Sequence, residues 1–380
     1  MQDKFFDCDI LILGGGCTGL NFALAYAKSN LNLSLTILEA RENYEHDRNW
    51  SFWIESNDNF QHRDIIRKTW NSWRFSTSEE SWSHISKKYE YVTIASRDFY
   101  DKAIQTIKND KRQTLILGCA VHTISGNTIQ TEKGIYNAKI VIDTRNNKNI
   151  KFEADASFYQ VFYGYEVKTK STFFDDTQVG LMTEMKNIKN SFSFLYVLPF
   201  SKTDGLIEYT VFTKDLIKPD DLRKELNHSI KKLIGDTNYD IKHIEQAVLP
   251  MGPLKMDQKK SSSTYIYAGT QAGALRESSG YGFLNIYNWA ISAVINLEKG
   301  KDISIYKNRS SMSQYLDRHF IKTLRISPSS SKKIFVTLTK KIQADDFVRF
   351  MSETNRLIDL IKIIIAVPKL PFLKALFKNE

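Results

Sequence analysis

A glycine-rich turn near the start of the chain constrains the fold more than any other feature. Residues 9–13 (DILIL) form a short apolar run that predicts a buried strand, and residues 14–19 (GGGCTG) follow it directly. Residues 20–28 have helical spacing, and residues 33–38 (LSLTIL) predict a second strand. A strand, a glycine turn, a helix and a strand within ~30 residues are typical of the βαβ unit that binds a dinucleotide.

The residues of this unit have separate expected roles in binding a cofactor. Gly14 permits the tight turn, Gly16 lets the backbone approach a pyrophosphate, and Gly19 allows the helix to pack closely on the strand. Glu39 ends the second strand, where a carboxylate can accept hydrogen bonds from a ribose. These residues alone leave both NAD and FAD open, and the structural alternative is a glycine turn without a ligand.

A second turn of small residues lies far along the chain. Residues 265–273 (YIYAGTQAG) predict a strand that ends at Gly269 and Gly273. The segment is either an ordinary strand–turn–helix junction or a second approach of the backbone to the cofactor. Because an extended FAD contacts more of a protein than one βαβ unit does, two such turns favour FAD, with Gly269 and Gly273 among the binding residues.

The rest of the chain divides by its patterning. Residues 98–108 predict a helix, and residues 113–117 and 138–143 predict further strands of the first sheet. Residues 57–95 are polar and rich in aromatic side chains, and they are interpreted as excursions from that sheet. Alternating strands follow from about 157 to 250, with residues 201–205 (SKTDG) as a hairpin turn.

We predict an α/β fold, in which a Rossmann-type FAD-binding domain is interrupted by an antiparallel β-sheet substrate domain and followed by a helical C-terminal region. The expected boundaries are 1–55, 90–150 and 260–300 for the FAD-binding domain, 56–89 and 151–259 for the β-rich substrate domain, and 301–380 for the C-terminal region. At 380 residues the chain is long enough for such a division.

Charge and cysteine usage narrow the function classes. The net charge of +10 could serve nucleic acid, an anionic membrane surface or solubility, but no basic block with interleaved aromatics is present, so we expect no nucleic-acid partner. Cys8, Cys17 and Cys119 lack metal-ligand spacing and are interpreted as small buried residues. We therefore expect no metal site and no disulfide framework, and a reducing, cytoplasmic compartment. We also expect no signal peptide and no membrane-spanning helix.

Several motifs together resemble the flavin-dependent lycopene β-cyclases. Residues 48–53 (RNWSFW) resemble the R-T-W-x-F-W segment of that family. The other matching segments are residues 98–100 (D-F-Y), Gln160, Phe162 and Gly164 (Q-x-F-x-G), 194–212 (FLYVLPFSKTDGLIEYTVF), 279–281 (the end of P-S-T-G-Y) and 368–373 (P-x-[LW]-P-F-L). The resemblance covers nearly the whole chain. It implies the fold of the aromatic-hydroxylase-like flavoproteins and an enzyme, an intramolecular lyase or isomerase, that closes β-ionone rings on lycopene or a related linear carotenoid.

The resemblance implies that Glu208 is the catalytic acid. From the residues alone, Glu208 is either a solvated strand residue or a buried acid with a raised pKa. Arg48 is expected near the cofactor, with a surface ion pair as its alternative. Where many relatives carry L-M-D, this chain has residues 181–183 (LMT) with Glu184 next, so Glu184 is the second candidate acid.

The resemblance also implies reduced FAD as the working cofactor in a reaction without net redox change, with NAD(P)H as the external reductant. Reduced flavin would stabilise a carbocation by its charge, and aromatic rings could assist by cation–π attraction. Tyr196, Tyr209 and Tyr281 are the candidate rings. Two alternatives to the cyclase remain: a flavoprotein monooxygenase or reductase that acts on another isoprenoid, and an inactive carotenoid- or flavin-binding protein.

The C-terminal segment has two interpretations. Residues 357–377 mix apolar side chains with Lys362, Lys369 and Lys374. They form either a packed helix or a surface that dips into lipid while its lysines meet headgroups. Because a carotenoid resides in the bilayer, we expect a cytoplasmic enzyme that associates peripherally with the membrane surface.

Overall fold

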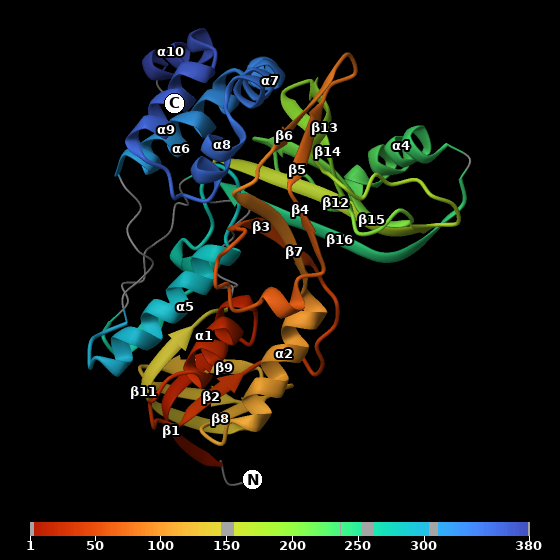
Figure 1. Cartoon of the computed structure of the whole chain (residues 1–380). Helices are drawn as coiled ribbons and strands as arrows, with labels where there is room; N and C mark the ends of the chain where they lie inside the picture. Colours follow the sequence, from red (N-terminus) through yellow and green to blue (C-terminus); the bar gives the residue numbers. More distant parts are fainter. Residues whose placement is uncertain (1–3, 146–155, 236, 253–261, 304–310, 379–380) are drawn as a thin grey trace.

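The computed structural model describes residues 4–145, 156–235, 237–252, 262–303 and 311–378. In Figure 1 the N-terminal sheet lies at one end of the molecule, and the C-terminal helices lie at the other. The described residues form three sheets, and the two large ones bring together strands that are far apart in the sequence. Within the described ranges, none of the helices combines the length and apolarity needed to cross a bilayer.

The first sheet confirms the predicted βαβ unit. Its strand order is β8-β2-β1-β11-β10-β9, with β17 also beside β11. Its strands are β1 (Phe5–Leu13), β2 (Leu35–Leu38), β8 (Gln113–Ile116), β9 (Val121–Ser125), β10 (Thr128–Thr131), β11 (Gly134–Asp143) and β17 (Tyr265–Tyr267). All of these pairs are parallel except those that involve β9 or β10. The apolar residues of β1 serve two cores, because Ile10 and Ile12 pack toward the helices while Leu11 and Leu13 pack on the opposite side.

Three helices accompany this sheet. α1 (Cys17–Ala27) follows the glycine turn, and it packs against α2 (Ser96–Asn109) and α5 (Phe283–Glu298). Figure 1 shows all three helices next to the strands of the first sheet. α5 therefore returns the chain to the βαβ unit after a long excursion, as expected for a discontinuous domain. We propose the predicted domain boundaries as the division of the chain.

The aromatic-rich stretch forms more ordered structure than the sequence suggested. β3 (Asn49–Glu55), β4 (Lys68–Trp70) and β7 (Tyr89–Ala95) form a separate sheet in the order β3-β7-β4. β5 (Ser72–Ser76) and β6 (Ser81–Ile85) join the edge of the second large sheet. The tryptophans of this stretch fill the space between the sheets, and Trp70 and Trp73 are fully buried.

The second large sheet contains the predicted alternating strands. Its order is β16-β12-β15-β14-β13-β5-β6, and all pairs are antiparallel except β5 with β13. The remaining strands are β12 (Phe158–Thr169), β13 (Val179–Ile188), β14 (Ser191–Pro199), β15 (Asp204–Thr213) and β16 (Tyr239–Met251). The hairpin turn predicted at 201–205 is confirmed, since it connects β14 with β15.

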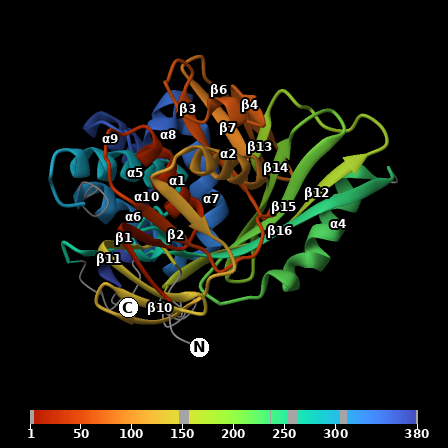
Figure 2. The ribbon, with the colours of Figure 1, turned by 90° about the horizontal axis from the view of Figure 1, so that it is seen from below.

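The two faces of this sheet have different neighbours. Alternate residues of β15 point to opposite faces, so Ile207 and Tyr209 pack toward α4 (Arg223–Ile234). Leu206 and Phe212 face the other core, together with Phe335 of the C-terminal helices. Figures 1 and 2 both show α4 on the opposite side of these strands from the C-terminal helices.

Helices cover the second face, as the sequence predicted for the C-terminal region. They are α6 (Ser311–Ile326), α7 (Ser331–Lys341), α8 (Ala344–Met351), α9 (Leu357–Ala366) and α10 (Lys369–Phe377). Phe335 of α7 stacks on Phe192 of β14, with ring centroids 4.7 Å apart. A buried ion pair at 2.7 Å joins Asp317 of α6 to Arg276, which follows β17. These contacts hold the helices above the face of the sheet that carries Glu208.

Candidate functional site

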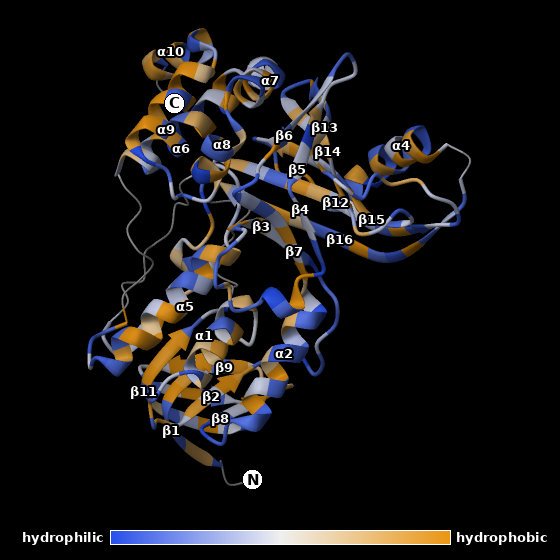
Figure 3. Cartoon of the chain, in the orientation of Figure 1, coloured by the Kyte–Doolittle hydropathy of each residue, from blue (hydrophilic) through white to orange (hydrophobic). Residues whose placement is uncertain are grey.

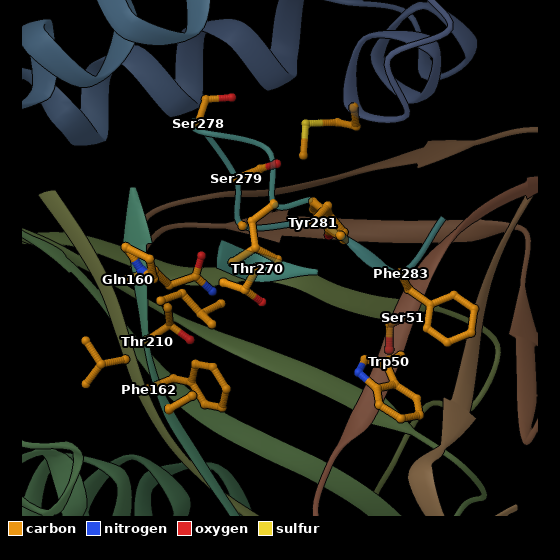
Figure 4. A pocket seen from close by; sticks show the side chains of 18 of the residues that line it. Trp50, Ser51, Gln160, Phe162, Thr210, Thr270, Ser278, Ser279, Tyr281 and Phe283 are labelled. Atoms are coloured by element: carbon orange, nitrogen blue, oxygen red, sulfur yellow. The ribbon is translucent and has the colours of Figure 1, made fainter. Parts of the chain in front are cut away.

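A cavity of about 1260 Å³ extends from the glycine turn to the C-terminal helices. Its wall draws on all three sheets and on the segment between β17 and α5. Figure 4 shows side chains from these elements around it, with Trp50 on β3, Gln160 and Phe162 on β12, Thr210 on β15 and Tyr281 on the turn. The cavity is mostly apolar, which suits a large hydrophobic ligand with few polar anchors.

The glycine turn forms one end of this cavity. Gly14 and Gly16 are in the wall, and Gly14 has a φ of +99°, which favours glycine. A Cβ added at Gly19 would lie 2.2 Å from the carbonyl oxygen of Gly14, so Gly19 serves close packing of α1 rather than the wall. A Cβ added at Gly16 would have no heavy atom within 4 Å. Open space therefore lies next to Gly16 at the N-terminus of α1, where a helix favours an anion.

Glu39 lies beside the glycine turn and is held by several donors. It is buried, and its Oε2 accepts the N–H of Gly15 at 2.7 Å. Its Oε1 accepts the N–H of Arg41 at 2.9 Å and the Nε–H of Arg41 at 3.1 Å. Arg41 also lies over the rings of Tyr44 and Tyr100. Glu39 and Arg41 are both in the cavity wall, and Arg41 was missed from the sequence, although it follows the strand-ending acid by two residues.

Of the other predicted cofactor residues, Arg48 is in the wall at the glycine-turn end of the cavity, whereas Gly269 and Gly273 are not. Arg48 is in the wall, with a half-exposed side chain whose Nε is 3.4 Å from Asp47. Gly269 and Gly273 have positive φ values of +81° and +82°, and they flank a short turn in which Thr270 is in the wall. Neither glycine is itself a wall residue. Their conformational freedom shapes the turn that presents Thr270.

The turn after β11 also borders the glycine-turn end of the cavity. The sequence analysis did not predict this turn. Thr144 and Arg145 are in the wall directly beside Gly14, and the hydroxyl of Thr144 donates to the carbonyl oxygen of Gly14 at 2.8 Å. The carboxylate of Asp143 accepts hydrogen bonds from Arg145 Nε at 2.9 Å and from the hydroxyl of Tyr265 at 2.9 Å. The sequence signal was Asp143 at the end of a predicted strand, followed two residues later by Arg145.

Glu208 lies in the cavity wall on β15, as the cross-strand neighbour of Tyr196 on β14. Its residue is only 6% exposed, so the solvated interpretation is wrong for this position. Burial, and then the charge of nearby Glu245, raise the pKa of Glu208 well above its ordinary value. Glu245 of β16 is also a buried wall residue, and sequence reasoning missed it. The structure thus brings two carboxyl groups together in an apolar cavity.

Three tyrosines line the middle of the cavity. The hydroxyl oxygen of Tyr91 is 2.7 Å from that of Tyr196 and 3.1 Å from that of Tyr281. Burial raises the pKa of all three, to about 12 for Tyr281, so these rings are neutral. Tyr196 and Tyr281, two of the three candidate aromatic rings, therefore line the cavity. Tyr209 does not, because it points to the α4 face and donates to Ser193 at 3.2 Å.

Glu184, the second candidate acid, lies outside the cavity wall. It has a positive φ of 53° on β13, and Lys232 of α4 donates to its carboxylate at 2.7 Å. Leu181 and Met182 of the same strand are in the wall instead. The irregular register of β13 against β14 turns Glu184 toward α4.

The overall arrangement is shared with solved flavoprotein structures. A geranylgeranyl bacteriochlorophyll reductase-like protein from Thermoplasma acidophilum is 13% identical, with 98% of this chain and 99% of that chain covered and a TM-score of 0.65. A flavin-dependent brominase is 13% identical over 91% and 93% of the two chains, with a TM-score of 0.62. A probable FAD-dependent monooxygenase from Pseudomonas aeruginosa is 9% identical over 86% and 98%, with a TM-score of 0.58. These likenesses confirm the predicted fold class.

The sequence itself was also compared with known proteins and families. A search of curated proteins finds no match. The family model described as lycopene cyclase protein matches residues 9–377, which is nearly the whole chain. This match agrees with the motifs that carried the resemblance, from the glycine turn to the last helix. The chain therefore belongs to the lycopene cyclase family.

Proposed function

We propose that this protein binds FAD noncovalently at the glycine-turn end of the cavity. The open space beside Gly16 suits a pyrophosphate at the N-terminus of α1. Glu39 suits the ribose, because its carboxylate is fixed in the wall: two donors of Arg41 occupy Oε1, whereas Oε2 accepts one short hydrogen bond, from Gly15, and retains lone-pair capacity. Thr270 and Arg48 would contact the cofactor farther along the cavity. The flavin dependence stated for the similar brominase and the FAD dependence stated for the similar probable monooxygenase support this assignment.

We propose that the reaction is the closure of β-ionone rings on lycopene or a related linear carotenoid, without net redox change. The observation that carries this proposal is the buried Glu208 carboxyl in the wall of an apolar cavity. Protonation of an isolated alkene requires an acid that is neutral at physiological pH and shielded from water. Glu208 suits this role, since it is buried in the cavity wall and burial raises its pKa well above the ordinary value.

In the proposed reaction, Glu208 both donates the first proton and accepts the last one. Its carboxyl donates a proton to the less substituted carbon of the terminal double bond, which leaves a tertiary carbocation at the other carbon of that bond. A second double bond farther along the chain attacks this cationic carbon and closes the ring, so that the positive charge moves to a ring carbon. A neighbouring ring C–H then loses its proton to the Glu208 carboxylate, and a ring double bond forms. Bound in its reduced, anionic form, FAD would supply negative charge beside the carbocation. The rings of Tyr196 and Tyr281 face the same space and can assist by cation–π attraction.

A stoichiometry experiment tests this proposal against the main alternative. Purified protein with FAD and lycopene is kept anaerobic, and the flavin is reduced once, either chemically or by NAD(P)H, which we propose as the external reductant. A cyclase forms many equivalents of cyclic product per equivalent of reductant. A monooxygenase or reductase acting on an isoprenoid forms at most one product per reductant, and a monooxygenase also requires O2.

We propose that the C-terminal helices hold this cytoplasmic enzyme on a membrane surface. α9 and α10 expose a row of apolar side chains, and the hydropathy colours of Figure 3 follow it. The exposed members are Leu357, Ile358, Ile361, Ile364, Ile365, Leu370, Leu373, Leu376 and Phe377. Ile364, Leu373 and Leu376 also belong to the cavity wall, so the cavity reaches this apolar surface. A carotenoid could then pass from the bilayer to Glu208 without crossing water.

The lysines of this surface are less available to lipid headgroups than the sequence suggested. Lys362 donates to Asp346 of α8 at 2.6 Å. Lys369 donates to the carbonyl oxygens at the end of α9, including that of Val367 at 3.0 Å, which caps this helix. Lys374 is exposed. We therefore expect apolar insertion, rather than attraction to headgroups, to dominate binding to the membrane.

A further inference from the structure

Two buried carboxyl groups lie on either side of a glycine in the second large sheet. β12 runs between β15 and β16, and its Gly164 is the direct cross-strand partner of both Glu208 and Glu245. A Cβ added at Gly164 would lie 2.6 Å from Cγ of Glu208. The side chain of Glu208 therefore lies over the missing side chain of Gly164 and leans across β12 in the direction of β16.

The two carboxyl groups have different hydrogen-bond partners. The main-chain N–H of Asn49 lies 3.0 Å from each oxygen of Glu245, and the side-chain Nδ2 of Asn49 donates to Oε2 at 3.0 Å. Within the described part of the chain, the Glu208 carboxyl has no hydrogen bond. Donors stabilise the charged form of a carboxyl group, and a dry cavity wall stabilises the neutral form. Burial raises the pKa of Glu245 as well, to about 7, but the donors of Asn49 counteract this rise, whereas Glu245 adds to the rise for Glu208. Glu245 is therefore the first of the two to ionise, and the proton stays on Glu208.

We propose that Glu245 is a positioning residue for the cyclisation: its negative charge, held by Asn49 across Gly164, keeps the proton on Glu208 between turnovers. This inference rests on the proposed function. Two carboxylates that flank one glycine in a buried site repel each other, so the second one stays protonated at a pH where an isolated carboxyl would ionise. The same repulsion favours the return of the ring proton to the Glu208 carboxylate at the end of each cycle.

Other titratable and charged side chains surround the pair and define the controls. They are His46, Asp47, Arg48, Arg67, Tyr91, Glu166, Tyr196, His243 and Tyr281. Burial raises the pKa values of the tyrosines and lowers that of His243. Burial alone would raise the pKa of Glu166, but hydrogen bonds from Arg67 hold it at about 2. His46 lies 3.5 Å from Glu166 and also acts electrostatically on Glu245. Its effect on the midpoint is measured separately in His46→Gln.

The test follows the Glu208 proton directly in the flavin-loaded protein. The infrared C=O band of a protonated carboxyl group is assigned to Glu208 by its loss in Glu208→Gln, and it is then titrated with pH. A group with a raised pKa loses its proton only at higher pH, so removal of the Glu245 charge lowers the pH at which the band disappears. In Glu245→Gln we expect this midpoint, and the alkaline limb of the cyclisation rate, to fall by about one pH unit or more. The rate at a pH above the limb then falls about tenfold, and the rate at acidic pH changes little.

Matched variants separate charge from structure. Glu245→Asp retains the charge and should restore most of the wild-type midpoint. Glu184→Gln makes the same chemical change on the same sheet outside the cavity wall and should leave the midpoint unchanged. If Glu245→Gln does not fold, as judged by flavin binding, the smaller neutral Glu245→Ser takes its place.

The possible outcomes distinguish this inference from the proposed function. An infrared midpoint and an alkaline limb that are the same in wild type and in the neutral variants would overturn the role of Glu245. A lowered infrared midpoint, with a wild-type protein that forms no cyclic product at any pH, would support the carboxyl pair and overturn the proposed cyclisation.

Discussion

Glu208 faces the cavity because of the strand in which it lies. In β15 its neighbours Ile207 and Tyr209 point toward α4, so the alternation of a strand turns Glu208 to the opposite face. The sequence predicts this alternation but not which face is dry, because that depends on the C-terminal helices more than a hundred residues later. Only the resemblance to the cyclases indicated a buried acid at this position.

Gly164 offers a direct test of the Glu208 geometry. The backbone of Gly164 does not require glycine, since its φ is not positive, but an added methyl group would collide with Cγ of Glu208. We expect Gly164→Ala to fold and bind flavin while it displaces the acid, and a displacement of about 1 Å can cost about a hundredfold in rate. The measurement is the cyclisation rate at saturating lycopene. Tyr163→Phe, on the opposite face of the same strand, is the control and should retain activity. A Gly164→Ala enzyme of normal rate would show that Glu208 acts from another position.

Among the helices, strands and turns, the sequence predicted those that are determined by residues close together in the chain. The glycine turn, α1 and the first two strands are local patterns, and they formed within a few residues of their predicted bounds. The segment 57–95 was not recognised as strands, although β5 and β6 form a local hairpin and β4 pairs with β7. Its place in the second large sheet depends on the pairing of β5 with β13, which lies far along the chain. Glu245 was missed for the same reason. It meets Glu208 only through the register of β12 with both β15 and β16, which no local pattern encodes.

The glycine turn carries the next prediction. Gly16 has a φ of −81°, so valine strains the backbone little, and its side chain enters the open space proposed for the pyrophosphate. We expect Gly16→Val to retain its far-UV circular dichroism but lose bound FAD, and Gly16→Ala to weaken binding less. Flavin absorbance after gel filtration measures the bound fraction. A Gly16→Val protein that keeps a full complement of flavin would contradict the proposed cofactor site.

At the scale of the whole molecule, the cavity connects three regions that are separate in sequence. One end is formed by the first sheet, the middle by β3 and the turn before α5, and the far end by α6, α7, α9 and α10. A hydrophobic chain that enters near the C-terminal helices meets Glu208 before it reaches the glycine turn. This order matches a carotenoid that arrives from a bilayer and a cofactor that stays at the opposite end.

The membrane surface is tested by changing residues that are exposed but outside the cavity wall. Leu370 and Phe377 are 81% and 86% exposed. We expect the double substitution of both by glutamate to weaken binding to liposomes by roughly tenfold or more, because apolar burial in lipid is lost. Phe5→Glu is the control, since Phe5 is 68% exposed at the start of β1, and Figure 1 shows β1 at the opposite end of the molecule from α10. Liposome flotation measures binding, and high salt should release only part of the wild type. Unchanged flotation of the double variant would assign α9 and α10 to packing alone.

In the proposed reaction, Glu208 supplies the proton that starts ring closure. The most direct test of this role is the anaerobic conversion of lycopene to cyclic product by Glu208→Gln with chemically reduced FAD. Glutamine keeps the shape of the side chain but cannot donate this proton. We therefore predict normal folding, bound FAD and a cyclisation rate about 10²- to 10⁴-fold below wild type, with partial activity in Glu208→Asp. A Glu208→Gln enzyme that cyclises lycopene at near wild-type rate would contradict the account.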